Sequence, residues 1–227
     1  MNDLPSFLRG GIPAELAETF AYLLLDTDGA AAEALVEDLC GQNVTPESIM
    51  LDLFAPAARL LGEMWCRDDA NFLEVTLGLG RIHRQLRRLP LLNRSAPVRG
   101  AVLLLPVPGE QHIFGLRVVQ EFLLRAGWRA HLAVAEDIAA LRRLVAERPY
   151  DIIGLSISGE RLLPVLPSVI NDIRAVTGNR DIRIMVGGAI LNGSGDGGLE
   201  IGADAIIRDA QGAVEQANAW CGLVDAE

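Results

Sequence analysis

The chain contains no lysine, and its 20 basic residues are all arginine. The absence of lysine excludes a Schiff-base lysine, the lysine of a phosphate-binding P-loop and a Ser–Lys catalytic dyad. Cysteine is also rare: Cys40, Cys66 and Cys221 are widely spaced and form no C-x-x-C pair. This pattern argues against a zinc cluster and favours a reduced cytoplasm.

Basic charge and long apolar runs are scarce as well. The net charge of −10 argues against binding to a nucleic-acid backbone as the main activity. We therefore expect no direct nucleic-acid binding, and any effect on DNA to pass through a protein partner. No uncharged apolar run reaches the roughly 18 residues of a membrane span, and the segment Met1–Pro5 lacks the basic start of a signal peptide. A cytoplasmic location without membrane contact is the expectation.

Residues 1–93 have the periodicity of helices. Apolar residues recur every three or four positions, which predicts amphipathic helices with one buried face. The first predicted helix begins near Pro13 and buries Leu16, Phe20, Leu23 and Leu24, and the second begins after Asp28 and stops at Gly41. The third begins at the cap Thr45-Pro46-Glu47-Ser48 and ends at Gly62. The fourth begins near Phe72 and ends at Leu89. Together they predict a four-helix bundle.

After a linker at residues 93–97, short apolar runs alternate with helical segments. The predicted strands are 100–106, 129–134, 151–157, 182–187 and 204–207; the predicted helices are 113–126, 137–147, 161–177 and 210–221, with a glycine-rich stretch at 190–201. This alternation predicts an α/β fold over residues 99–227, with a doubly wound, parallel, five-stranded sheet of the Rossmann or flavodoxin type. No G-x-G-x-x-G follows the first strand, which argues against a dinucleotide.

Three loops stand at the expected carboxyl edge of this sheet, where such folds bind ligands. They are Glu110-Gln111-His112-Ile113-Phe114-Gly115, Gly154-Leu155-Ser156-Ile157-Ser158-Gly159 and Val186-Gly187-Gly188-Ala189. Singly they are typical of an ordinary histidine, a helix cap and a tight turn. Together they are more specific, because a neutral imidazole can reach a metal while a nearby acid orients its other nitrogen. We interpret the chain as a holder of a metal-containing cofactor and not as an enzyme.

In this order the three segments resemble the cobalamin-binding domain of the methionine synthase and methylmalonyl-CoA mutase class. That family carries Asp-x-His-x-x-Gly, then a Ser-x-Leu/Thr/Ser segment, then Gly-Gly. The resemblance implies that His112 replaces the dimethylbenzimidazole base as the lower axial ligand of cobalt. It also implies that the following residues contact the cofactor: Glu110, Gln111, Gly115, Ser156, Ser158, Gly187, Gly188 and Asp209. Where the family has aspartate this chain has Glu110, so whether its longer side chain reaches the imidazole is open.

The helical half resembles the bundle that caps the upper cobalt face in such proteins. Leu61-Gly62-Glu63-Met64-Trp65 matches a Gly-Glu-x-Trp motif, and Glu74 falls near the acid that follows it. Val75 stands where light-sensing repressors have a histidine. His83 is a possible substitute upper ligand, or else an exposed histidine among arginines. Trp65 contacts the upper face, or else packs in the core.

The length of 227 residues leaves no room for a catalytic module. The Glu-x-His-x-x-Gly variant, the arginine-only composition and the layout resemble the PpaA/AerR-type regulators of photosynthesis genes. The resemblance implies a light- or redox-responsive antirepressor that acts through a DNA-binding repressor of the PpsR/CrtJ type. The alternatives are a corrinoid shuttle in methyl transfer, a haem-binding sensor of the same fold, and a flavodoxin-like domain without a ligand.

A basic stripe marks the last predicted helix of the first half. Arg81, Arg84 and Arg88 fall on one face, with Arg87 nearby. Such a stripe is typical of a solvated helix face. It could instead be a docking patch for a partner or for DNA phosphates, or reach the rim of the corrin.

Overall fold

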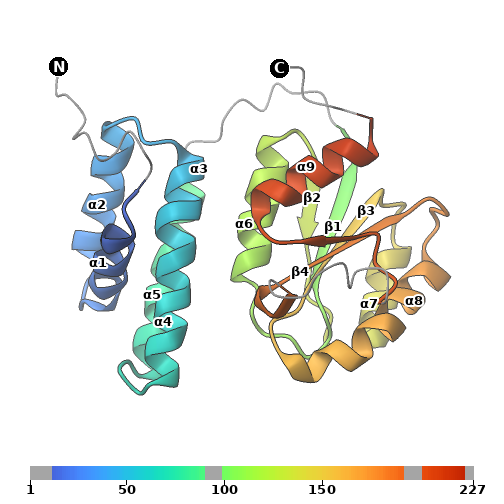
Figure 1. Cartoon of the computed structure of the whole chain (residues 1–227), viewed down its shortest axis with the longest axis horizontal. Helices are drawn as coiled ribbons and strands as arrows, with labels where there is room; N and C mark the ends of the chain where they lie inside the picture. The colour runs from blue at the N-terminus through green and yellow to red at the C-terminus, as the bar shows by residue number, and fades with distance from the viewer. Residues whose placement is uncertain (1–11, 90–98, 192–200, 223–227) are drawn as a thin grey trace. The chain divides into compact units, whose positions relative to one another are not determined.

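The computed structural model describes residues 12–89, 99–191 and 201–222, and the chain forms two compact units, Met1–Leu91 and Leu92–Glu227 (Figure 1). The first unit is helical and the second is α/β. The predicted linker at residues 93–97 and most of the predicted glycine-rich stretch lie outside the described residues.

The helical unit contains four helical rods, as predicted. They are α1 (Ala14–Leu25); α2 (Ala30–Gly41); a continuous rod of α3 (Pro46–Ser48), the π-helical η2 (Ile49–Phe54) and α4 (Ala55–Cys66); and α5 (Phe72–Arg88). Thr45 caps the third rod by accepting a hydrogen bond from the Ser48 N–H. The core is apolar, and the stacked rings of Phe20 and Phe54 lie 5.6 Å apart within it.

One predicted helix end needs correction. Gly62 does not end the third rod, because Leu61 and Met64 keep one face of α4 buried on both sides of it and the helix runs on to Cys66. The second helix does end at Gly41, but the residue with left-handed backbone is Asn43, with φ of 60°. An asparagine tolerates that conformation better than most side chains.

The arginines of α5 divide into two kinds, which the sequence pattern did not separate. Arg81 is half-buried and donates hydrogen bonds to the carbonyl oxygens of Leu24, Asp26 and Thr27, at the end of α1. Arg88 forms an ion pair with Glu33 of α2. The prediction of a solvated or docking stripe is wrong for Arg81, whose side chain holds α5 against the end of α1, whereas Arg88 is exposed as expected and also pairs with α2.

Replacing Arg81 with alanine is expected to lower the free energy of unfolding of the helical unit by about 2 kcal/mol, because three carbonyl groups lose their charged donor. Arg59→Ala in α4 is the matched control, since Arg59 makes one long, exposed hydrogen bond to Ala55. Urea unfolding followed by circular dichroism measures both. Equal effects of the two substitutions would contradict the assignment.

The α/β unit contains a parallel sheet with the strand order β2-β1-β3-β4-β5. Its strands are β1 (Ala101–Pro106), β2 (Arg129–Leu132), β3 (Ile152–Ser156), β4 (Arg183–Gly187) and β5 (Ala205–Ile207). Its helices are α6 (Phe114–Arg125), α7 (Ile138–Ala146), α8 (Leu166–Val176) and α9 (Ala210–Trp220). This is the flavodoxin-like order, in which the chain reverses direction between β1 and β3. The predicted doubly wound sheet is confirmed.

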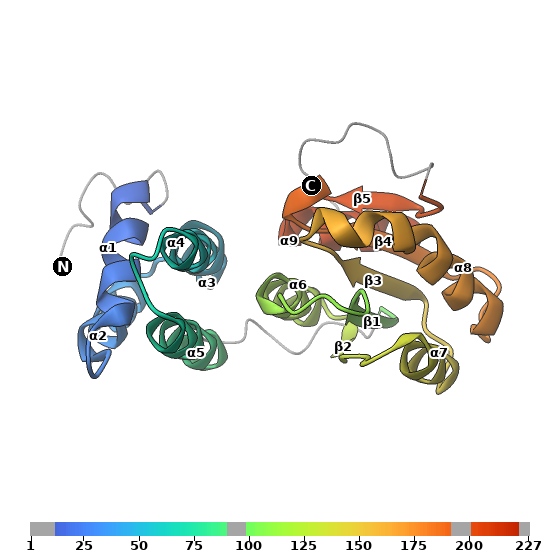
Figure 2. The same cartoon turned by 90° about the horizontal axis from the view of Figure 1, so that it is seen from below.

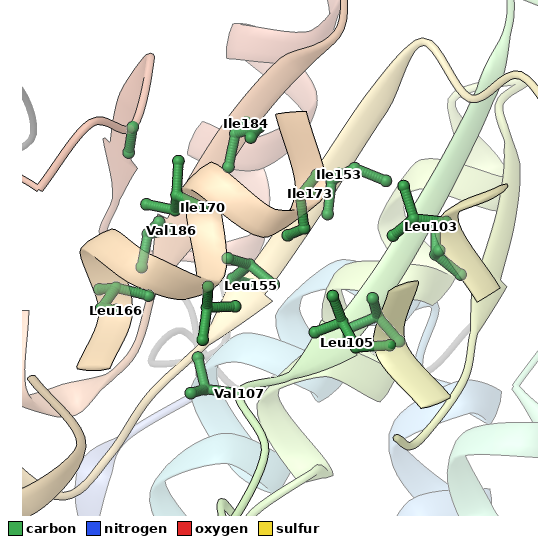
Figure 3. Packing of buried hydrophobic residues seen from close by; sticks show 14 of the residues in the cluster. Leu103, Leu105, Val107, Ile153, Leu155, Leu166, Ile170, Ile173, Ile184 and Val186 are labelled. Atoms are coloured by element: carbon green, nitrogen blue, oxygen red, sulfur yellow. The ribbon is translucent and has the colours of Figure 1, made fainter. Parts of the chain in front are cut away.

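Helices cover both faces of the sheet. Figure 2 shows α6 and α9 on one face and α7 and α8 on the other. Alternate residues of β1 point to opposite faces: Leu103 and Leu105 join the cluster under α7 and α8, whereas Val102 and Leu104 join the cluster under α6 and α9. Figure 3 shows the first cluster, where Ile153 and Leu155 of β3 lie among these side chains. Burial on both faces explains why the strands are continuous apolar runs.

The predicted helix 161–177 is wrong in its first third. Glu160–Val165 forms a 3-10 segment (η3), and the α-helix begins only at Leu166. Pro164 explains the difference, because proline cannot donate the backbone hydrogen bond that a continuous α-helix requires. Within the described ranges, no helix combines the length and hydrophobicity needed to cross a membrane.

Candidate functional site

The three loops predicted from the sequence do meet at one edge of the sheet. Pro106, Ser156 and Gly187, the last residues of β1, β3 and β4, are register partners in adjacent strands. The Glu110–His112 segment follows β1, and Gly188 follows β4 directly. The edge therefore presents groups from three strands around the point where the chain reverses direction between β1 and β3.

Glu110 is the structural centre of this edge. Its side chain is only 3% exposed, and both carboxylate oxygens are used. Oε1 accepts hydrogen bonds from the backbone N–H groups of Gln111 and His112, each at 2.8 Å, and lies 2.6 Å from His112 Nδ1. Oε2 accepts a hydrogen bond of 2.6 Å from the backbone N–H of Ser158. Glu110 thereby links the β1–α6 loop to the loop after β3.

These contacts keep Glu110 ionised. Burial raises the pKa of its carboxyl group, but hydrogen bonds from the backbone of His112 and Ser158 and from the His112 ring lower it, and the net pKa lies below the usual value. The question left open by the sequence is answered: the longer glutamate side chain reaches the imidazole. Its extra methylene also lets it reach Ser158.

His112 presents one ring nitrogen outward. The ring lies beside an ionised carboxylate that can only accept, so Nδ1 is the donor and Nε2 is the ring nitrogen left for another partner. The side chain is 74% exposed. A neutral imidazole oriented by a carboxylate through one nitrogen is the arrangement that metal-binding histidines use. Among the described residues no group of three or more His, Cys, Asp or Glu is gathered for a metal.

Gly188 is the backbone position at which this edge requires glycine. Its φ is 138°, and a Cβ there would overlap the carbonyl oxygen of Ile157. The neighbouring Gly187 accepts a hydrogen bond of 3.0 Å from the Ile157 N–H. Sequence reasoning missed Ile157, since a buried apolar residue at the end of a strand carries no signal for a role in the site.

Ser156 carries an unsatisfied polar atom. Its Oγ is buried, yet it has no hydrogen-bond partner in the part of the chain that the structure describes. A buried hydroxyl without a partner costs free energy, so such atoms commonly mark the place of a ligand or an ordered water. Ser158 contributes its backbone N–H to Glu110.

The remaining predicted site residues of the α/β unit are Gly115, Gln111 and Asp209. Gly115 lies in the first turn of α6, where an added Cβ would meet nothing within 4 Å, so the packing of the chain does not explain this glycine. Gln111 is exposed beside His112. Asp209 caps α9 by accepting a hydrogen bond of 2.7 Å from the Gly212 N–H. Cofactor contacts by these three residues stay predictions.

The candidate residues of the helical unit differ in their burial and in their contacts. Trp65 is 49% exposed and meets Phe72 edge-on, with ring centroids 6.5 Å apart, so it is not a core residue. Glu74 forms a capping box with Asn71 at the start of α5. Val75 is buried. His83 is half-buried and its Nε2 is covered, so the alternative of an exposed histidine is wrong and an upper ligand would have to use Nδ1.

Comparison with known families identifies the protein family to which this chain belongs. The family model for the B12 binding domain matches residues 100–218, and a second B12 binding domain model matches residues 16–78. The chain belongs to the B12 binding domain family. The first match covers the sheet and all three loops of the site.

Two known proteins are similar to this chain over most of its length, one in structure and one in sequence. The monomethylamine corrinoid protein of Methanosarcina barkeri superposes with a TM-score of 0.69 at 15% identity, over 89% of this chain and 97% of that one. The "Uncharacterized 20.5 kDa protein in bchF-crtJ intergenic region" of Rhodobacter capsulatus is 27% identical over 181 residues, which are 78% of this chain and 94% of that protein. The superposition shows that this chain and the Methanosarcina barkeri protein share a fold.

The residues at the sheet edge fit cobalamin. His112 supplies the nitrogen that would hold cobalt, and Ser156 Oγ is a buried hydroxyl in need of a partner. Glu110 ties these two features together through Ser158. Cobalamin supplies a cobalt ion already held by a corrin ring, so one protein nitrogen is sufficient.

Proposed function

We propose that this protein binds cobalamin with His112 as the lower axial ligand and works as a regulator without enzymatic activity. The observation that carries the first half is the Glu110–His112 pair, in which a buried carboxylate holds Nδ1 and leaves Nε2 exposed. Glu110 orients the imidazole, and the backbone of Gln111 and Ser158 keeps Glu110 in place.

The buried Ser156 hydroxyl at the end of β3 favours cobalamin over haem. Haem has no nucleotide tail, so it would give the buried Ser156 hydroxyl no partner. Cobalamin bound through a protein histidine must place its displaced base and nucleotide somewhere. The Ser156 hydroxyl is the group that supports this placement.

The regulatory half of the proposal is supported by the Rhodobacter capsulatus relative, whose name places its gene beside crtJ. The expected partner is a DNA-binding repressor of the PpsR/CrtJ type, whose name matches the crtJ gene. We expect the protein to act in the cytoplasm, by binding such a DNA-binding repressor and not DNA itself. Light is the expected signal because the cobalt–carbon bond of an alkylated cobalamin is photolabile, and redox change at cobalt is the alternative.

A second candidate function is a corrinoid carrier in methyl transfer, which the shared fold with the Methanosarcina barkeri corrinoid protein supports. Both candidates need the same His112 site, so the site alone does not separate them. They differ in the partner: the carrier requires a methyltransferase, whereas the regulator requires a repressor.

The axial ligand is tested by mixing the protein with hydroxocobalamin or adenosylcobalamin in the dark, desalting, and recording absorption spectra. We expect the wild type to retain cobalamin with the spectrum of a displaced base. His112→Ala is expected to lose that spectral change, and His131→Ala, at an exposed histidine of β2, is the matched control. Retention with an unchanged spectrum in His112→Ala would refute the assignment, and retention of haem alone would refute cobalamin.

The signal is tested by measuring the affinity for a PpsR/CrtJ-type repressor with adenosylcobalamin bound, in the dark and after illumination. A ligand shifts a two-state protein only by its differential affinity for the two states, so light must change the Kd for the partner if it is the signal. Equal values of Kd in dark and light would remove light as the signal. Binding to a methyltransferase in place of the repressor would favour the carrier.

A further inference from the structure

The face of α5 that points away from the helical unit carries a regular stripe. Its members recur at spacings of four and three residues, which places them along one side of a helix. We call them the outer α5 stripe: Leu73, Leu77, Gly80, Arg84 and Arg87. Leu73 is 64% exposed and Leu77 is 50% exposed. The opposite face of α5, with Val75, Ile82 and Leu86, is the one buried in the unit.

Nothing in the helical unit explains the residues of this stripe. Leu73 and Leu77 form one wall of a surface cavity of about 380 Å³ whose other wall includes Leu25 and Thr27 of the α1–α2 turn. A Cβ added at Gly80 would meet nothing within 4 Å. An exposed glycine inside a helix is unfavourable unless something must approach the backbone closely.

The charges along α5 are opposite at its two ends. Asp68 and Asp69 precede the helix and are exposed, and Arg84 and Arg87 are exposed on its last turns. None of these four side chains has an ion-pair partner within the described residues, in contrast to Arg81 and Arg88. An acidic end followed by two leucines, a glycine and a basic end is complementary to itself when a second copy runs in the opposite direction.

We propose that the outer α5 stripe is the interface between two copies of this chain, packed antiparallel about a twofold axis. The axis passes near Leu77, and Leu73 of each copy then lies beside Gly80 of the other, where the absence of a side chain lets the two helices approach closely. Leu73 and Leu77 of each copy are then covered, and Arg84 and Arg87 of one copy meet Asp68 and Asp69 of the other. A twofold axis repeats each contact, as is usual for dimers with self-complementary surfaces.

Charge argues against DNA as the occupant of this face. Acidic residues outnumber arginines in the described part of the helical unit, and Asp68 and Asp69 lie in the turn at the other end of α5 from the two arginines. A phosphate backbone would be repelled by the acidic end, whereas a second copy is attracted at both ends.

The first test is the oligomeric state of the full chain without added cobalamin, measured by sedimentation velocity across a wide range of concentrations. We expect a reversible dimer. Leu77→Glu is expected to raise the Kd of the dimer by about tenfold or more, because it buries a charge at the centre of the interface. Tyr22→Glu is the matched control, since Tyr22 is exposed on α1 away from the stripe. A monomer at every concentration would overturn the proposal.

The antiparallel arrangement is tested by exchanging the charges. The variants Arg84→Glu/Arg87→Glu and Asp68→Arg/Asp69→Arg are each expected to lose the dimer, because like charges then face each other. Mixed together they are expected to form a heterodimer, since one copy is acidic at both ends and the other is basic at both ends. Failure of the mixture to associate, or undiminished dimers of either variant alone, would overturn the antiparallel interface. The result does not depend on cobalamin binding, so it is independent of the proposed cofactor.

Discussion

Replacing Gly188 with alanine is expected to lower the free energy of unfolding of the α/β unit by about 3 kcal/mol or more and to abolish retention of cobalamin. The alanine Cβ would overlap the Ile157 carbonyl oxygen, and the φ of 138° is itself unfavourable for a residue with a side chain. Relief of the overlap must separate the loop after β4 from the end of β3. That movement displaces Ser156 and Ser158, which lie on either side of Ile157.

Gly178→Ala is the control for Gly188→Ala. Gly178 follows α8, its φ lies outside the left-handed region, and an added Cβ meets nothing within 4 Å. We expect this substitution to change the free energy of unfolding by less than about 0.5 kcal/mol. Urea unfolding measures stability, and absorbance after desalting measures retention. A Gly188→Ala protein as stable as the control would show that the edge does not require glycine.

Replacing Glu110 with glutamine is expected to weaken cobalamin binding by about 10- to 100-fold, which is the usual effect of removing the group that orients a metal-binding histidine. It is also expected to cost about 2–3 kcal/mol of stability, because the buried carboxylate accepts hydrogen bonds from three backbone N–H groups. The glutamine amide can accept through only one oxygen, so its NH₂ group would face the Ser158 N–H or the His112 ring.

The contribution of Glu110 to stability has a defined pH dependence. Its pKa is lower in the folded protein than in the unfolded chain, so its ionised form stabilises the fold above the unfolded pKa of about 4.3. This stability is lost as the pH falls through the lower, folded pKa. The stability difference between wild type and Glu110→Gln is therefore expected to shrink below about pH 4.

Urea unfolding at a series of pH values measures this dependence. Glu136→Gln is the control, because Glu136 is exposed and forms no hydrogen bond within the described residues. A stability difference between wild type and Glu110→Gln that does not change with pH would contradict the role given to the ionised carboxylate.

The order of elements and the edge that carries the site could be predicted from the sequence. The strands β1, β3 and β4 are buried on both faces, so they appear as apolar runs, and parallel strands bring their carboxyl ends to one edge. The loops after these strands were therefore expected to meet. The pairing of Glu110 with His112 was also accessible, since the two residues are neighbours in the chain.

Contacts between distant segments could not be predicted in the same way. The bond from Ser158 to Glu110 spans 48 positions, and the need for glycine at 188 depends on where the Ile157 carbonyl lies. The arginines of α5 are alike in sequence, yet Arg81 is half-buried against the end of α1, Arg88 pairs with Glu33, and Arg84 and Arg87 are exposed without an ion pair among the described residues.

The sequence by itself determined the helical half, the parallel α/β half, and a histidine and a carboxylate at the edge where such sheets bind ligands. These features follow from local periodicity and from the rules of parallel sheets, which act within short segments. Only the tertiary structure decided that Glu110 reaches both loops, that Ser156 Oγ lacks a partner and that Gly188 has no room for a side chain. The physical reason is that burial, hydrogen bonding and steric overlap at this edge depend on the distances between strands that are far apart in the chain.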